Sequence, residues 1–320
     1  MRAKSIIRYI LKRLLIAIPV LIGITLLDFL IMNLAGNPLE MLMGPRVSQG
    51  AIELRALEMG LNEPFFVRYW IWLKAVLSGD LGYSIKTFES VSKMISTRLG
   101  PTLLLMGSSL LLTLLIAIPA GIYSAVKKYS AGDYLIVGFS FLSISVPSFF
   151  LALVLIYIFS SKLGILPSSG MYTLGAERSF ADTLRHMILP VITMTASLVG
   201  NNIRYIRSGM LEILEANYLR TAKAKGIGQS KVILKHALRN ALLTIVTAIG
   251  MQIPMIFGGS IIIEQVFAWP GLGLMTMSAI LARDYPVIMG TALLAAVVVQ
   301  VTNLITDILY VIIDPTISLE

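Results

Sequence analysis

Long apolar runs, separated by shorter polar segments, dominate this sequence. A helix needs roughly 20 mostly apolar residues to cross the hydrocarbon of a bilayer. Runs close to or above this length lie at Leu14–Leu34, Leu103–Val126, Tyr134–Ser161, Met187–Ile203, Asn240–Ile263 and Tyr285–Ile313. Apolar and polar positions do not alternate within them, as they would in the strands of an outer-membrane barrel. The pattern predicts an all-α, polytopic protein with six transmembrane helices, the fourth of which is short.

Lysine and arginine gather in alternate connecting segments. Residues 1–13, 127–133 and 204–239 together hold 15 of them, whereas the short segments 162–186 and 264–284 hold four. Because basic residues are enriched in cytoplasmic loops, we expect both termini in the cytoplasm and the protein in the inner (cytoplasmic) cell membrane. The segment Ala35–Thr102 is too long for this rule and is expected outside.

The composition agrees with a membrane protein and excludes several chemistries. Hydrophobic residues make up 57% of the chain and charged residues 13%, against about 25% charged in soluble domains. The chain has no cysteine and two isolated histidines, so it offers no thiolate site and no histidine metal cage. It also lacks a P-loop, an H-E-x-x-H motif and a Ser/His/Asp arrangement. We therefore expect no enzyme activity and no metal, and the net charge of +9 reflects topology rather than nucleic-acid binding.

Polar residues inside the apolar runs are candidates for function. Asp28 and Asp307 are the acids lying well inside these runs, and ionisable residues in a membrane mark functional sites by default. Three roles remain open for them: a structural role (a hydrogen bond to a neighbouring helix, or contact with lipid headgroups), a polar path, or ion coupling. Asn201, Asn202, Gln252, Gly258, Gly259 and Ser260 are candidates for a translocation path, with close helix packing as the alternative. Prolines 19, 119, 147, 190 and 254 predict kinks.

The chain divides by pattern into two parts. Residues 1–102 hold the first span and the long outer segment, and residues 103–320 hold a five-helix core. In the outer segment Ser48 is expected to cap a helix that ends at Leu61. Pro64–Leu77 is rich in aromatic residues suited to a membrane interface, and its role is either a lid packed on the bundle or contact with a solute.

The inner segment 204–239 is the most informative part of the chain. Helix-forming residues run from Met210 to Lys225, and Gly226-Ile227-Gly228 should end that helix. Ser230 can cap a second helix, Lys231–Asn240, which leads into the fifth span. The residues alone leave two roles open: docking on a partner protein, or lying on anionic headgroups. A DNA-binding helix-turn-helix is disfavoured by the membrane tether.

This segment resembles the coupling signature of ATP-binding-cassette importer permeases, E-A-A, three residues, G, nine residues, I-x-L-P. The same register here gives Arg220-Thr221-Ala222, Gly226 and His236-Ala237-Leu238-Arg239. The second alanine, the glycine and the leucine match, whereas Arg220, Thr221, His236 and Arg239 depart from the signature. The departures resemble the peptide-importer branch, in which stretches such as Tyr218-Leu-Arg-Thr-Ala-Lys-Ala-Lys-Gly226 are typical.

Further stretches resemble the dipeptide/oligopeptide/nickel permease family in order along nearly the whole chain. They are Asn37-Pro-Leu39, Gly79-Asp-Leu-Gly-Tyr-Ser84, Val146-Pro-Ser-Phe149, Leu163-Gly-Ile-Leu-Pro167, Glu264-Gln-Val-Phe-Ala-Trp-Pro-Gly-Leu-Gly273, Arg283-Asp-Tyr-Pro286 and Asp314-Pro315. The long outer segment is similar to that of the first permease subunit in such systems.

The resemblance implies an importer permease of the type I fold and a set of partners. These are a second, unlike permease, two cytoplasmic ATPases that bind ATP and magnesium, and an extracytoplasmic solute-binding protein, with no cofactor in this chain. It implies that the ATPases dock on Glu215, Tyr218, Arg220, Thr221, Ala222, Lys223, Ala224, Lys225, Gly226, His236, Leu238 and Arg239. Peptides are the expected cargo, with nickel, glutathione or another small solute as alternatives. A gradient-driven carrier using Asp28 and Asp307 is the alternative from another class.

Overall fold

The computed structural model describes residues 2–36, 50, 62–225, 228 and 232–313. Apart from an isolated bridge between Tyr83 and Ser90, the regular structure of these residues is helical. The long helices are α1 (Arg2–Leu34), α4 (Val91–Val126), α7 (Phe180–Leu214), α10 (Leu238–Val266) and α12 (Tyr285–Ile313). The shorter ones are α3 (Phe65–Leu77), α5 (Ala131–Ser145), α6 (Ser148–Leu155), η2 (Ile156–Lys162), α8 (Asn217–Ala224), η3 (Val232–Ala237) and α11 (Leu272–Leu281).

The helices confirm an all-α membrane protein and support up to five of the six predicted spans. In the described residues, α1, α4, α7 and α12 are each long and apolar enough to cross a bilayer, and α5 with α6 and η2 forms a bent fifth candidate. The remaining predicted span, Asn240–Ile263, lies within α10, whose apolar stretch is Leu243–Pro254. A count of six therefore stays a prediction.

The third predicted span is not one straight helix. Its two halves meet at an angle of 96° between Ser145 and Ser148. Val146 has an extended backbone, with φ −86° and ψ 120°, as expected for the residue before a proline. Pro147 has no backbone N–H with which to continue the hydrogen bonds of the helix. The kink predicted at Pro147 is thus a full break, whereas prolines 19, 119, 190 and 254 lie inside continuous helices.

The fourth span is longer than the predicted Met187–Ile203. Helix α7 runs from Phe180 to Leu214 and continues through Arg204 and Arg207. Ser179 caps its start by accepting a hydrogen bond from the backbone N–H of Asp182 at 3.1 Å. Arg207 is accommodated because it meets a carboxylate from another helix, as described below, whereas the side chain of Arg204 is exposed.

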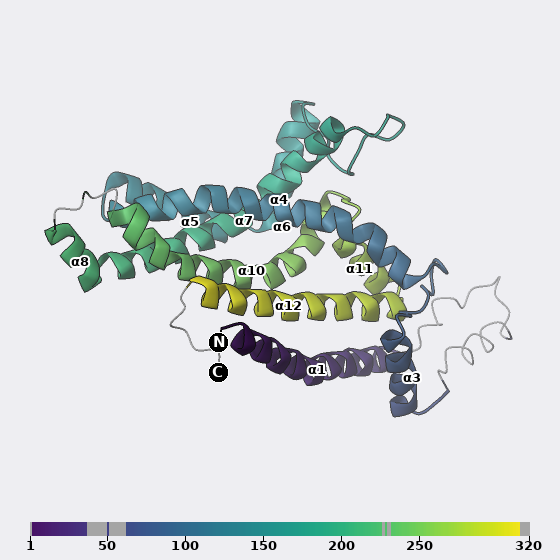
Figure 1. Cartoon of the computed structure of the whole chain (residues 1–320). Coiled ribbons are helices and arrows are strands. Elements are labelled where there is room, and N and C mark those ends of the chain that lie inside the picture. The colour runs from purple at the N-terminus through teal and green to yellow at the C-terminus, as the bar shows by residue number, and fades with distance from the viewer. Residues whose placement is uncertain (1, 37–49, 51–61, 226–227, 229–231, 314–320) are drawn as a thin grey trace.

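The bundle has α7 and α10 at its centre (Figure 1). Helix α7 packs against α4, α5 and α10, and α10 also packs against α12, which carries α1 on its other side. Helix α8 lies at one end of the bundle and α3 at the opposite end. Helix α4 begins at Val91 and runs without a break across residue 102, so the division of the chain at that residue stays a prediction.

Helix α3 packs on the first span. The hydroxyl groups of Tyr69 and Thr25 lie 3.0 Å apart, and the Phe29 ring meets the rings of Phe65 and Tyr69 edge-on, with centroids 5.4 and 5.6 Å away. The aromatic segment is therefore a helix held against α1. The helix expected from Ser48 to Leu61 lies outside the described residues.

Asp307 has a structural partner on the first helix. Its carboxylate accepts a hydrogen bond from the Tyr9 hydroxyl at 2.8 Å and forms an ion pair with Arg13 at 2.7 Å. Of the three roles left open for Asp307, the structure favours the bond to a neighbouring helix. Asp28 has no hydrogen-bond or ion-pair partner among the residues that the structure describes.

A buried carboxylate organises the end of the bundle opposite α8. Glu264 accepts hydrogen bonds from the Thr102 hydroxyl at 2.8 Å and from the backbone N–H of Leu274 at 3.0 Å. A Cβ atom at Gly271 or Gly273 would collide with this carboxylate, so these glycines leave the space that it occupies. The stretch Glu264–Gly273 thereby joins α4, α10 and α11.

Candidate coupling site and transport path

The segment predicted to dock on ATPases begins with a turn rather than a continuous helix. A single helix was predicted from Met210 towards Lys225, but α7 ends at Leu214 and α8 starts at Asn217. Every residue here is tolerated in a helix, so local propensity does not explain the break. The turn at Glu215 and Ala216 redirects the chain so that Leu219 enters the core.

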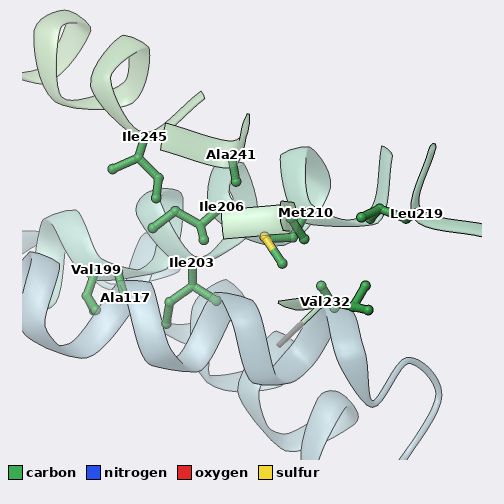
Figure 2. Packing of buried hydrophobic residues seen from close by; sticks show 11 residues of the cluster. Ala117, Val199, Ile203, Ile206, Met210, Leu219, Val232, Ala241 and Ile245 are labelled. Atoms are coloured by element: carbon green, nitrogen blue, oxygen red, sulfur yellow. The ribbon is translucent and has the colours of Figure 1, made fainter. Parts of the chain in front are cut away.

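Leu219 fastens α8 to the bundle (Figure 2). Its side chain is 0% exposed and belongs to a buried cluster with Met210 of α7, Val232 and Ala237 of η3, and Ala241 of α10. Complete burial of a leucine stabilises a fold by roughly 1.5–3 kcal/mol. Leu219 therefore ties α8 into the buried cluster that also holds residues of η3, α7 and α10.

Apart from Leu219 and Ala216, the described side chains of α8 and of the residues flanking it are exposed and polar. Tyr218, Thr221 and Lys225 are exposed. The Tyr218 hydroxyl accepts a hydrogen bond from the side-chain amide of Asn240 on α10 at 2.7 Å. Glu215, also exposed, lies 3.9 Å from Lys128 in the connection between α4 and α5. Among the α8 side chains that the structure describes, Tyr218 and Thr221 are therefore accessible from outside, while Leu219 holds the helix to the bundle.

Several predicted docking residues lie wholly or partly outside the described residues. Gly226 is outside them, as is the predicted cap Ser230. The backbone is described, but not the side chains, at Arg220, Ala222, Lys223, Ala224, His236, Leu238 and Arg239. Beyond the gap, η3 passes directly into α10, as predicted for a second helix leading into the fifth span. The docking role of these residues stays a prediction.

A buried ion pair, missed by the sequence analysis, supports this region. Arg207 donates from Nε and Nη2 to the two carboxylate oxygens of Asp133, each at 2.9 Å, and Asp133 is 2% exposed. The Ser124 hydroxyl and the backbone N–H of Tyr129 also donate to Asp133. One carboxylate therefore joins α4, α5 and α7. The sequence did hold a signal for this pair, because an acid precedes the third predicted span and an arginine follows the fourth.

Only part of the predicted translocation path comes together. The Asn202 amide donates to the Gln252 side-chain oxygen at 2.8 Å, with both residues buried between α7 and α10. Asn201 points elsewhere and is exposed, since successive helical residues are rotated by about 100°. Ser260 is buried and donates to the Phe257 carbonyl in its own helix at 3.0 Å. The surroundings of Gly258 and Gly259 are not among the features that the structure describes.

A cavity of about 430 Å³ opens between α5 and α7 on the Asn201 side. It is lined by Val137, Phe141, Asn201, Arg204, Tyr205, Arg207, Ser208 and Leu211. Arg207 there is the partner of Asp133, and the Arg204 guanidinium lies 5.2 Å from the centroid of the Phe141 ring.

Sequence comparison assigns the chain to a family. Residues 117–319 match the family described as "Binding-protein-dependent transport system inner membrane component", and residues 6–106 match the N-terminal part of such membrane components. The chain belongs to this family. It is a membrane subunit of a transport system, as the resemblance predicted, and not an enzyme.

Curated relatives of this permease cover almost its whole length. The oligopeptide transport system permease protein AppB of Bacillus subtilis is 45% identical, over 97% of this chain and 99% of its own. The dipeptide transport system permease protein DppB of Alkalihalophilus pseudofirmus and the glutathione transport system permease protein GsiC of Salmonella typhimurium are each 38% identical, with the same coverage.

A solved structure shares the fold of the permease. An inward-facing form of the MetNI methionine ABC transporter contains a chain that superposes with a TM-score of 0.55 at 17% identity. The match covers 69% of this permease and 96% of that chain. The likeness supports the predicted type I importer fold, and at this identity it shows the fold alone.

Proposed function

We propose that this chain is one of two unlike permease subunits of an ATP-driven, binding-protein-dependent importer of peptides. The relatives named for oligopeptides and dipeptides, which match over almost the full chain, support a peptide cargo. Glutathione is the second candidate, because relatives named for its transport also match at 38% identity. Cargo passes between the two permeases.

The proposed coupling mechanism rests on the way α8 is attached to the bundle. One side of the helix is anchored through Leu219, while Tyr218, Thr221 and Lys225 remain open. We infer that a cleft in one ATPase receives the stretch from Arg220 to Gly226. Closure of the ATPase pair on ATP and magnesium then shifts α8, and the buried cluster passes this movement to α7 and α10. Transport requires such different contacts in two states, because a ligand shifts an equilibrium only by its differential affinity.

The sidedness follows the distribution of basic residues. The end of the bundle that carries α8 and the α4–α5 connection faces the cytoplasm in this proposal, with both termini on the same side. The opposite end, with α3 and the α11–α12 connection, then faces the solute-binding protein. The protein resides in the inner membrane as one of five components, with the second permease, two ATPases and the binding protein.

Reconstitution tests the proposal. The complete complex in vesicles, with ATP on the ATPase side, should accumulate a peptide only when the binding protein and both ATPases are present. Ala222→Glu or Gly226→Asp should abolish both uptake and the stimulation of ATP hydrolysis. Accumulation by the permease alone, or uptake that collapses with an uncoupler while ATP is clamped, would refute an ATP-driven importer.

A further inference from the structure

The exposed face of α7 changes character along its length. Leu184 and Ile192, in its first half, are exposed and apolar, as a lipid-facing surface should be. In the second half the exposed positions are Asn201, Arg204, Tyr205, Ser208 and Glu212. Their spacing of three and four residues places them on one side of the helix. This polar face borders the cavity between α5 and α7, so it suits water or a polar ligand better than lipid chains.

The two arginines of the cavity differ in charge balance. Arg207 is neutralised by Asp133 at 2.9 Å. Arg204 lies about one turn earlier, is exposed, and forms no ion pair within the part of the chain that the structure describes. Its guanidinium packs over the Phe141 ring at 5.2 Å, a contact that orients the group without cancelling its charge. The cavity thus presents an uncompensated cation on a membrane helix, a feature that marks solute and ion pathways.

A carboxylate is the ligand that this cation fits. The planar fork of an arginine matches the two oxygens of a carboxylate with parallel hydrogen bonds. The Asn201 amide and the hydroxyl groups of Tyr205 and Ser208 line the same cavity and can bond the polar atoms beside that carboxylate. A peptide with a free C-terminus carries such a group at its end whatever its sequence, so one site serves many cargoes.

We propose that Arg204 binds the C-terminal carboxylate of the peptide as it passes along the face of α5 and α7. The inference rests on the proposed function and adds the chemical group by which this permease holds its cargo. An acid of the second permease and a lipid phosphate are the competing partners, and the experiment below distinguishes both from the cargo.

The test compares ATP-driven uptake by the complete transporter carrying Arg204→Gln, Arg204→Lys or Arg178→Gln. Arg178 is a matched control, an exposed arginine stacked on a ring, 4.4 Å from the Tyr172 centroid, in the connection before α7. The substrates are one tripeptide as its free acid and as its C-terminal amide, chosen so that wild type carries both. Arg204→Gln should lower free-acid uptake about tenfold or more, since a hydrogen bond to a charged group contributes about 1.5–3 kcal/mol. Uptake of the amide should change far less, Arg204→Lys should keep part of the activity, and Arg178→Gln should behave as wild type.

Four results would overturn the carboxylate site. They are unchanged free-acid uptake in Arg204→Gln, an equal loss for acid and amide, loss of the second permease on purification, and a defect that disappears when anionic lipids are replaced by phosphatidylcholine. The third would assign Arg204 to the permease interface and the fourth to lipid. If wild type itself shows no ATP-driven peptide uptake, the proposed function is refuted. The four results above refute only the carboxylate site, so the two failures can be told apart.

Discussion

The carboxylate of Asp284 accepts a hydrogen bond from the backbone N–H of Ile85 at 3.0 Å, across 199 positions of the chain. Asp284 is 3% exposed and also accepts the hydroxyl hydrogen of Ser84. Two stretches that the sequence analysis noted separately, Gly79–Ser84 and Arg283–Pro286, therefore meet at one buried acid. This contact holds the loop before α4 against the connection between α11 and α12.

Replacing Asp284 by alanine should loosen this end of the bundle. The change leaves the N–H of Ile85 and the hydroxyl of Ser84 without their acceptor, at a cost of about 1–3 kcal/mol for each buried group left unpaired. We expect a lower thermal unfolding temperature in detergent and faster amide hydrogen exchange at residues 84–90. Asp80→Ala, whose carboxylate bonds only the nearby Gly82 N–H among the described contacts, serves as the control. Unchanged exchange at Ile85 would contradict the assignment.

Truncation of Leu219 should separate ATP hydrolysis from transport. Leu219→Ala removes the anchor of α8 from a fully buried site, where such changes cost about 2–5 kcal/mol. Because α8 is a short surface helix, we expect much of this cost to appear as local loosening of α8. Peptide uptake per ATP hydrolysed should fall, while the ATPases still co-purify with the permease.

Leu219→Met is the companion variant, since it conserves volume and should cost less than about 1.5 kcal/mol. It should keep near-normal coupling. If Leu219→Ala transported with wild-type stoichiometry, the anchor would have no part in coupling.

The Asp133–Arg207 pair should behave as a unit. Breaking a buried ion pair by removing one partner costs about 3–5 kcal/mol, because the other charge stays buried without compensation. Arg207→Gln leaves the Asp133 carboxylate, 2% exposed, without its cation and should be the more destabilising change, whereas Asp133→Asn should cost less because the Arg207 side chain is 23% exposed. The double variant should be more stable than the sum of their effects predicts. Thermal unfolding of the four proteins measures the coupling energy, and strict additivity would show that the pair contributes no interaction of its own.

Neutralising Asp307 should leave active transport in place. Its carboxylate bonds Tyr9 and Arg13, so Asp307→Asn should lower thermal stability through the contact between α1 and α12. Uptake with clamped ATP should persist and should be insensitive to an uncoupler. Complete loss of uptake in a folded, assembled Asp307→Asn complex would instead favour the gradient-driven carrier.

Hydropathy alone predicted where most long helices end, because apolar length is a local property. The predicted spans that finish at Leu34, Val126 and Ile313 end at the last residues of α1, α4 and α12. The predicted fourth span ended at Ile203 because Arg204 and Arg207 lower local hydropathy. Its extension depended on where these side chains lie, and Arg207 finds its compensation in Asp133 on a different helix.

The turn before α8 was missed for a similar reason. Residues around Glu215 favour a continuous helix by propensity, and the break is explained by the burial of Leu219, which depends on η3 and α10. The structural role of Asp307 likewise depends on residues far away in the sequence, Tyr9 and Arg13. The sequence analysis could therefore single out the coupling segment and the pair Asn201 and Asn202 of α7, but it could not tell Asn202, bonded to Gln252, from its exposed neighbour Asn201.

The absence of side chains at Gly271 and Gly273 has an evolutionary consequence. The Glu264 carboxylate occupies the space that a Cβ atom at either glycine would fill. Packing therefore couples the residues allowed at these three positions. Alanine at Gly271 would also collide with the Thr102 hydroxyl, and alanine at Gly273 with the backbone of Ile261. A homologue could therefore lose the acid and still need both glycines, whereas one that gained a side chain at either glycine would have to move several neighbours at once.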